Sequence, residues 1–312
     1  MKISRTLRNL GKGSAHRLFE AGQRVGLDIL PRHFYSSIPD LRTLKSNTRW
    51  RQPLSMVGVA GADADRQLEF VGECCPEPIR ARLARGDIAA DAMRANGEPG
   101  FGVIEADFLY AFIASKRPRK VVQIGSGVST AVILLAARET GIPIEVVCVE
   151  PYPNQFLRDA ARDGTIRLIA EKAQAVSLDE LLALGSGDLF FVDSTHTVQP
   201  GGEVNRIILE VLPRLAGGSH IHFHDIAFPY DYTRSLLKED FFFPTESTLL
   251  HAFLVHNSRV SISAALSMLH YQRPNELRRL LPNYEPQPND DGLQVPGSTG
   301  HFPSSAYLRV AH

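Results

Sequence analysis

The chain has 312 residues, of which 44% are hydrophobic and 22% charged, a balance typical of a globular protein rather than of a disordered one. Its 34 Lys and Arg residues equal its 34 Asp and Glu residues, so the net charge gives no reason to expect a nucleic-acid partner. Three cysteines, two of them adjacent, indicate no disulfide framework and suit a reducing cytoplasm. The sequence contains no apolar run long enough for a transmembrane helix, and no apolar segment of a signal peptide follows the basic residues 1–8.

The N-terminal region carries two features of interest. Residues 4–25 place apolar side chains at helical spacing with Arg and Lys between them, which predicts a basic amphipathic helix. Such a helix could lie on an anionic membrane surface, but packing against its own protein is the favoured interpretation. Next, His33, Tyr35 and Asp40 lie in a proline-rich segment, where they either bind a ligand or belong to an extended segment that buries its aromatic rings.

From residue 66 onward the pattern becomes regular. Helices are expected over 66–84, with a break at its prolines, and over 106–115. Strands and helices then alternate to the end of the chain, which implies βαβ units and a mostly parallel sheet whose last strand can run antiparallel. The expected strands are 120–124, 144–150, 166–169, 188–193, 219–225, 259–263 and 305–310. The expected helices between them are 129–140, 154–162, 177–184, 202–215, 245–256 and 275–281.

The first of these strands breaks into a glycine turn that opens a helix. Gly125 and Gly127 permit backbone conformations or a close ligand approach that other residues hinder, and Ser129 or Thr130 can cap the helix. Free N–H groups at a helix start, beside the carboxyl end of a parallel strand, are where open α/β sheets bind ligands. A purely structural turn is the alternative.

Acidic and imidazole side chains end three further strands. Glu150 ends the second strand at a spacing from Gly125 that suits hydrogen bonds to both ribose hydroxyls of a nucleoside. The alternative is an acid that stabilises a helix start. Asp193 ends the fourth strand and His196 lies three residues later, while His224 and Asp225 end the fifth. Adjacent strand ends meet in one cleft, so Asp193, His224 and Asp225 could hold a divalent ion, or His196 or His224 could act as a general base.

Taken together, these motifs resemble the class I S-adenosylmethionine-dependent methyltransferases, in a branch with catechol O-methyltransferase-like and cephalosporin-hydroxylase-like members. The resemblance covers about two thirds of the chain. It rests on six segments: 123–127 as the first motif, 149–150 as the acidic motif, 173–174 at the adenine-edge position, 191–196 as the fourth motif, 222–225 at the end of the fifth strand, and 305–310 as the reversed last strand. It implies a doubly wound, mostly parallel seven-stranded sheet of the Rossmann-like methyltransferase type over residues 101–312, with residues 1–100 as an N-terminal helical and extended cap.

The resemblance also implies ligands and roles. S-adenosylmethionine would contact a set of residues around the turn and the neighbouring strand ends: Gln123, Gly125, Ser126, Gly127, Ser129, Thr130, Glu150, Ala173, Gln174 and Asp193. His196, His224 and Asp225 would be catalytic, with a Mg²⁺-like ion held by Asp193, His224 and Asp225, and His33, Tyr35 and Asp40 would contact the acceptor.

The expected reaction is O-methylation of a small molecule or of a glycan- or lipid-linked acceptor in the cytoplasm, by a chain that could form a homo-oligomer. A metal-dependent hydroxylase of the cephalosporin-hydroxylase-like type, a nucleotide-cofactor oxidoreductase and a non-enzymatic binding module are the alternatives. The oxidoreductase is disfavoured because Thr130 stands where its G-x-G-x-x-G motif needs a last glycine.

Overall fold

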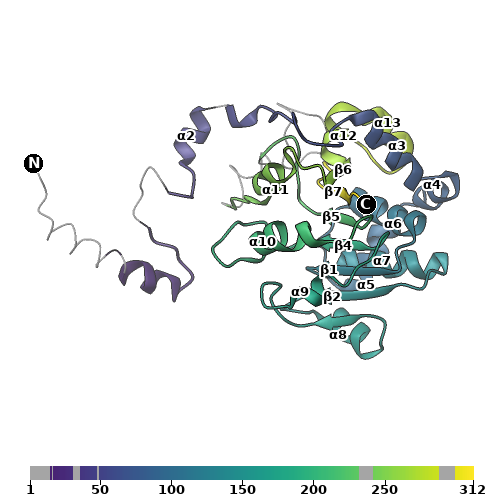
Figure 1. Ribbon diagram of the computed structural model, residues 1–312, viewed down its shortest axis with the longest axis horizontal. Helices are drawn as coiled ribbons and strands as arrows, with labels where there is room; N and C mark the ends of the chain where they lie inside the picture. Colours follow the sequence, from purple (N-terminus) through teal and green to yellow (C-terminus); the bar gives the residue numbers. More distant parts are fainter. Residues whose placement is uncertain (1–14, 16, 31–35, 48, 232–241, 288–298) are drawn as a thin grey trace, which may run out of the picture. The chain divides into compact units, whose positions relative to one another are not determined.

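The computed structural model describes residues 15, 17–30, 36–47, 49–231, 242–287 and 299–312. The chain divides into two units, Met1–Ser46 and Asn47–His312. The first unit contains helical residues 17–23 and helix α2 (Leu41–Ser46), whose first amides donate to the Asp40 carboxylate. The second unit contains the sheet and all the other elements (Figure 1). Over the described ranges, no helix is long and apolar enough to cross a membrane.

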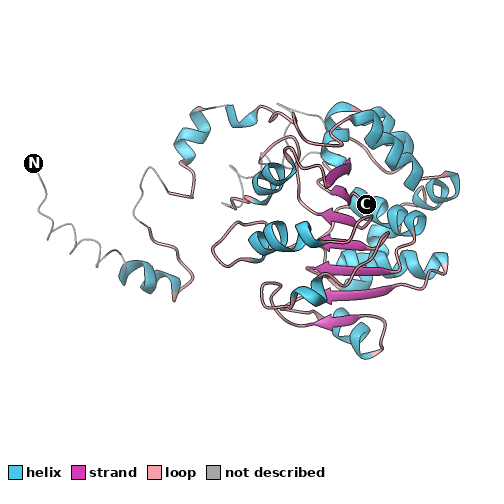
Figure 2. Ribbon diagram, in the orientation of Figure 1, coloured by secondary structure: helices cyan, strands magenta, loops and turns pink. Residues whose placement is uncertain are grey.

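One seven-stranded sheet runs through the second unit, with helices against it (Figure 2). The strand order is β3-β2-β1-β4-β5-β7-β6; β7 pairs antiparallel with both β5 and β6, and the other pairs are parallel. The predicted doubly wound sheet with a reversed last strand is therefore confirmed. The strands are β1 (Lys120–Ile124), β2 (Glu145–Val149), β3 (Arg167–Ile169), β4 (Leu189–Val192), β5 (His220–Phe223), β6 (Val260–Ala265) and β7 (Ala306–Val310).

The helices of the second unit lie before, between and after the strands. Before the sheet come η1 (Arg49–Arg51), α3 (Ala64–Cys74), α4 (Glu77–Leu83), α5 (Ile88–Asn96) and α6 (Val103–Lys116). Within it come α7 (Val128–Thr140), α8 (Gln155–Arg162), α9 (Leu178–Leu181), α10 (Glu203–Arg206), α11 (Glu246–Leu254), α12 (Leu266–Gln272) and α13 (Pro274–Leu280). A π-helical turn η2 (Ile207–Val211) and a 3₁₀ turn η3 (Leu212–Arg214) continue α10, so the predicted helix 202–215 is helical throughout but changes type along its length.

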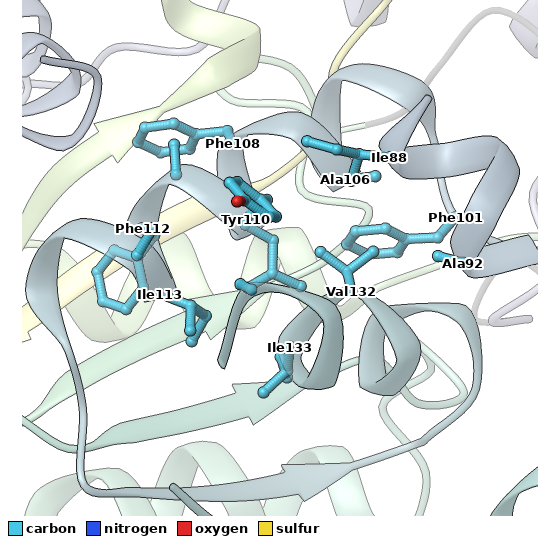
Figure 3. Packing of buried hydrophobic residues seen from close by; sticks show 14 of the residues in the cluster. Ile88, Ala92, Phe101, Ala106, Phe108, Tyr110, Phe112, Ile113, Val132 and Ile133 are labelled. Carbon is cyan, nitrogen blue, oxygen red and sulfur yellow. The ribbon is translucent and has the colours of Figure 1, made fainter. Parts of the chain in front are cut away.

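Alternation along the strands creates two apolar cores, one on each face of the sheet. Successive strand side chains point to opposite faces, so Val121 joins the core under α3, α5, α6 and α7, whereas Val122 joins the core under α9, α10 and α11. Figure 3 shows the first core, in which the apolar side chains of α6 pack beside Val132 and Ile133 of α7. With both faces covered, the site residues can lie only at the ends of the strands.

The division between the two units differs from the predicted boundary near residue 100. Helices α3, α4 and α5 bury apolar side chains such as Val71, Leu83 and Ile88 in the same core as α6 and α7. These helices belong to the main unit because they supply part of the apolar layer that covers one face of the sheet. Helix α12, which directly follows β6, was not expected from the sequence.

Candidate active site

Backbone hydrogen bonds carry the ladder one residue past the strands and so fix the residues that follow them. The amide of Gly125 donates to Val149 O at 3.0 Å, that of Asp193 to Ile124 O at 2.8 Å, and that of His224 to Val192 O at 2.9 Å. Glu150 is held in the same way by Ile169 O at 3.1 Å. The carboxyl ends of β1, β2, β4 and β5 therefore lie side by side as one rigid edge of the sheet, along the strand ends. Between β1 and β4 the strand order reverses, and open α/β sheets bind ligands at such a point.

The glycine turn after β1 is imposed by its neighbour. Gly125 has φ of 77°, and a Cβ placed on it would lie 1.7 Å from the carbonyl oxygen of Asp193. Only glycine fits this position, because any side chain would collide with fixed backbone. The turn thus brings the start of α7 directly against the end of β4.

Gln123 and Thr130 lie beneath the turn. Gln123 Nε2 donates to Ser129 Oγ at 2.6 Å, Thr130 Oγ1 donates to Gln123 Oε1 at 2.7 Å, and Gly127 N donates to Thr130 Oγ1 at 3.2 Å. Both Gln123 and Thr130 are fully buried, and neither lines the cavities described below. Of the residues predicted to contact the cofactor, these two instead hold the shape of the turn.

Two cavities meet at the turn. The first, of about 290 Å³, lies against segment 96–101 and is lined by Ser126, Gly127 and Ser129 among others. The second, of about 490 Å³, is lined by Ala173, Gln174 and segment 199–203 among others. Gly125, Glu150, Tyr152 and Asp193 line both. A larger cavity of about 730 Å³ near α5, α7 and α8 contains none of the predicted site residues.

The backbone aims the carboxylate of Glu150 into both cavities. Tyr152 N donates to its Oε1 at 2.9 Å, and Ser126 N donates to its Oε2 at 3.3 Å. A carboxylate has about four lone-pair sites, so each oxygen keeps capacity for a further donor. Glu150 therefore offers an oriented, negatively charged acceptor where the cavities join.

Acids and histidines meet beside the second cavity. His196 Nε2 lies 3.3 Å from Asp193 Oδ1 and 3.7 Å from Asp225 Oδ2. His224 Nδ1 lies 3.6 Å from Asp193 Oδ1 and 3.5 Å from Asp225 Oδ1, which are ion-pair distances too long for hydrogen bonds. The structure thus brings His196, His224, Asp193 and Asp225 together, as the strand ends predicted.

Charge pairing within this cluster shifts the pKa values of His196, His224 and Asp193 more strongly than burial does. Burial alone would lower the pKa of His196, but its hydrogen bonds to Asp193 and Glu246 and the charge of Asp225 raise that pKa to about 10. Burial acts on His224 in the same direction, and Asp193 and Asp225 raise its pKa well above the ordinary value. Burial would raise the pKa of Asp193, but the two histidines hold it well below its usual range. Near neutral pH the cluster is a set of paired charges.

Of the alternating histidines in and directly after β5, His220, His222 and His224, only His224 reaches the cluster. The ring of His222 is stacked on Phe191 at 4.3 Å, its Nε2 is 3.0 Å from Ser305 Oγ, and complete burial lowers its pKa. Burial also lowers the pKa of His220, to about 4. Both are neutral core histidines.

Three further residues complete the cluster, and the sequence motifs did not indicate them. Glu246 Oε2, from α11, lies 2.8 Å from His196 Nδ1. Ser304 Oγ, just before β7, donates to Asp225 Oδ1 at 3.0 Å. The ring of Phe101 is stacked on that of His224 at 4.7 Å. Glu246 is the first residue of a helix and Ser304 lies two residues before a strand, but nothing local to either position shows that it faces the cluster.

The structure does not test the residues that are predicted to contact the acceptor. His33 and Tyr35 lie outside the described residues. Asp40 belongs to the first unit, where its carboxylate caps the start of α2. The proposed contact between these residues and an acceptor therefore remains a prediction.

The geometry gives no support to the predicted metal ligands Asp193, His224 and Asp225. No group of three or more His, Cys, Asp or Glu side chains within the described ranges is placed so that it could hold a metal ion. These residues do not fit a divalent-ion site.

Comparison with known proteins agrees with this geometry. Residues 122–226 match a family model described as a methyltransferase domain. An uncharacterised protein from Archaeoglobus fulgidus is 27% identical over 146 residues, which are 44% of this chain and 64% of that protein, so the match spans less than two thirds of the relative.

Solved structures resemble the chain more distantly. The O-methyltransferase TomG from Streptomyces achromogenes, in complex with SAM, is 15% identical over 74% of this chain and 89% of its own, with a TM-score of 0.44. SAH-bound PaMTH1 from Podospora anserina is 15% identical over 91% and 99% of the two chains, with a TM-score of 0.40. At such scores these likenesses carry no argument about function. The segment that contains the glycine turn and the ends of β1, β2, β4 and β5 thus matches a methyltransferase domain.

Proposed function

We propose that this protein transfers the methyl group of S-adenosylmethionine to an oxygen of a small molecule or of a glycan- or lipid-linked acceptor. The observation that carries the proposal is the pair of cavities that meet at Gly125, Glu150 and Asp193 inside the segment matched by the methyltransferase family. Two connected cavities on either side of an oriented carboxylate suit a ligand with a nucleoside at one end and a charged amino acid at the other.

The residues around the cavities have the chemistry that this cofactor needs. Glu150 would accept hydrogen bonds from the ribose hydroxyls, with Ala173 and Gln174 beside the adenine in the second cavity. The backbone of Gly125, Ser126 and Gly127 would contact the methionine moiety of the cofactor in the first cavity. Ser129 also lines that cavity.

The bound cofactor supplies an electrophilic methyl group on a sulfonium sulfur. The protein's contribution is to hold the acceptor oxygen in line with that methyl group, because correct alignment can supply a large part of the rate. The rigid edge formed by the ends of β1, β4 and β5 suits this task, since backbone hydrogen bonds fix each of its residues.

The acceptor proton would leave toward the acid cluster. Both ring nitrogens of His196 already face carboxylates, with Nδ1 at Glu246 and Nε2 at Asp193 and Asp225, so this imidazole has no free lone pair for the acceptor. The side chain of Asp225 is about half exposed, at 53%, and Ser304 orients it. We therefore assign Asp225 as the group that accepts the hydrogen bond of the acceptor hydroxyl, with His196 and His224 balancing the charge of the acids.

The proposed acceptor contacts come from the N-terminal segment. His33, Tyr35 and Asp40 remain candidates for contacting the acceptor, because a segment dense in aromatic and ionisable groups suits that role. The hydroxylase alternative would need a metal site that the described donor set does not form, and no observation favours the oxidoreductase alternative.

Calorimetry with S-adenosylmethionine and its demethylated product tests the cofactor assignment. The unmodified protein should bind both, and Glu150→Ala should weaken binding about 10- to 100-fold, because hydrogen bonds to a charged group are worth about 1.5–3 kcal/mol. Glu69→Ala, an exposed acid on α3, is the matched control and should leave the affinity unchanged. Absence of binding by the unmodified protein would refute the proposal.

A second experiment addresses the acceptor. Incubation of the protein and methyl-labelled cofactor with fractionated cell extract should transfer label to a compound that carries it on oxygen. Label recovered only on nitrogen or carbon would contradict the proposed O-methylation.

A further inference from the structure

Glu246 is an acidic side chain in an unusual place. It is the first residue of α11, where an acid normally faces water and interacts with the positive end of the helix. Here the side chain is turned inward and is only 1% exposed. Its Oε2 lies 2.8 Å from His196 Nδ1, whereas its Oε1 has no hydrogen-bond partner. Burial of a carboxylate with half of its acceptors unpaired costs stability, so a purely structural role explains this placement poorly.

The backbone around Glu246 also holds His196. The carbonyl oxygen of His196 accepts hydrogen bonds from Thr245 N at 2.8 Å and from Glu246 N at 3.1 Å. Val198 N donates to Thr245 Oγ1 at 2.7 Å, which fixes the same loop two residues later. His196 adopts a φ of 56°, an uncommon conformation for a non-glycine residue that needs such support.

Contacts to both backbone and ring leave His196 little freedom. With Nδ1 held by Glu246, the opposite nitrogen Nε2 is directed at Asp193 and Asp225, at 3.3 and 3.7 Å. Rotation of the ring would break the contact to Glu246 and the contacts to both acids together. The orientation of Asp193 and Asp225 at the cavity edge is therefore coupled to a residue 50 positions further along the chain.

We propose that Glu246 is a positioning residue for methyl transfer, which fixes the ring of His196 and thereby the carboxylates of Asp193 and Asp225 in the reactive geometry. The inference rests on the proposed function and extends it to a residue that lines neither of the two cavities. Glu246 acts through His196, so its removal should lower turnover while leaving cofactor affinity intact.

The direct test is NMR of the full chain labelled with ¹⁵N-histidine. In the unmodified protein the Nδ1-bound proton of His196 should resonate far downfield, as expected of a proton shared with a carboxylate. Glu246→Gln keeps the size and an acceptor oxygen but removes the charge, and it should move this signal upfield. Thr245→Val is the matched control: it loosens the same loop by removing the contact to Val198, yet leaves the carboxylate in place, so the signal should stay.

Two outcomes would overturn the inference. In the first, the His196 signal is the same in Glu246→Gln as in the unmodified protein. In the second, the signal moves equally in Glu246→Gln and Thr245→Val, which would show that loosening of the loop alone causes the shift. Should Glu246→Gln not fold, Glu246→Asp is the substitute, because it keeps the charge but is one methylene shorter. It should give an intermediate shift of the His196 signal. An unmoved signal in Glu246→Asp would also overturn the inference.

Kinetics with the acceptor identified by the labelling experiment complete the test. In Glu246→Gln, kcat should fall at least about 10-fold, within the range that positioned acid–base groups contribute, while the dissociation constant for S-adenosylmethionine changes less than about twofold. In a His196→Gln background the same substitution should have no further effect on kcat. Multiplicative effects would overturn the inference, whereas failure of the unmodified protein to bind the cofactor would refute only the proposed function.

Discussion

The carbonyl oxygen of Asp193 decides which residue can begin the turn after β1. It lies 1.7 Å from where a Cβ of Gly125 would be, and its own position is fixed by the hydrogen bond from Asp193 N to Ile124 O. Two other residues at the strand ends, His196 and Asp225, have φ of 56° and 55° without being glycine. Two of the four described non-glycine residues with positive φ thus lie at the site, where the surrounding contacts stabilise them.

A pair of glycine substitutions separates the collision at this turn from the general cost of positive φ. Gly125→Ala should destabilise the fold by several kcal/mol or abolish binding of S-adenosylmethionine, because its Cβ meets fixed backbone. Gly141→Ala, at φ of 64° with nothing within 4 Å of its Cβ, should cost only about 1–2 kcal/mol and leave binding intact. Thermal unfolding and calorimetry on both variants measure the difference, and equal effects would show that contact with Asp193 is unimportant.

At the scale of elements, helix α6 joins the N-terminal helices to the sheet and contributes to the site. Its Glu105 accepts a hydrogen bond from Ser304 N at 2.9 Å, and Ser304 in turn orients Asp225. Phe101, just before the helix, is stacked on His224. The elements before β1 thus hold Asp225 and His224 in place, in addition to covering the sheet.

The same helix buries an acid whose ionisation opposes folding. Asp107 is 1% exposed, and burial raises its pKa to about 6 despite a 2.8 Å hydrogen bond from Asn283 Nδ2. Because its pKa is higher in the folded than in the unfolded chain, the folded state binds more protons between about pH 4 and pH 6. The contribution of Asp107 to stability is thus fully present below about pH 4 and is lost as the pH rises through 6.

Asp107→Asn should remove this part of the pH dependence. The variant should match the unmodified protein near pH 4 and exceed it by up to about 2–3 kcal/mol at pH 7.5, since one pKa unit corresponds to about 1.4 kcal/mol. Urea unfolding at a series of pH values measures the difference, with the exposed Asp163→Asn as control. A difference between variant and unmodified protein that is the same at every pH would contradict the assignment to Asp107.

At the scale of the whole molecule, the main folding unit begins at Asn47 and includes α3, α4 and α5. A fragment of residues 47–312 should therefore unfold cooperatively and bind S-adenosylmethionine as the full chain does. A fragment of residues 101–312 should not fold, because it lacks the apolar side chains of α3 to α5 that cover one face of the sheet. Circular dichroism and calorimetry decide both expectations.

The longer fragment also tests the N-terminal acceptor residues. It lacks His33, Tyr35 and Asp40, so it should bind cofactor yet transfer methyl groups poorly if these residues contact the acceptor. Unchanged turnover would assign acceptor binding to the main unit alone.

Much of the fold follows from local sequence patterns. The alternation of β-branched strands with helices predicts the parallel sheet, and the late position of segment 305–310 permits its antiparallel last strand. The glycine turn and the acids at the strand ends predict that Gly125, Glu150, Asp193 and Asp225 lie at one edge, because parallel strands end at the same side of a sheet. These inferences succeed because they depend on periodicity and on strand direction, which neighbouring residues determine.

The partners that hold those residues were decided only by tertiary packing. Glu246, Ser304 and Phe101 reach His196, Asp225 and His224 from elements 50, 79 and 123 positions away in the sequence. No local pattern encodes which face of α11 turns toward the end of β4, or that α3 to α5 join the core instead of forming a separate cap. The sequence by itself therefore determined the sheet, the glycine turn and the charged strand ends, whereas packing between distant elements decided how those charges are paired and buried.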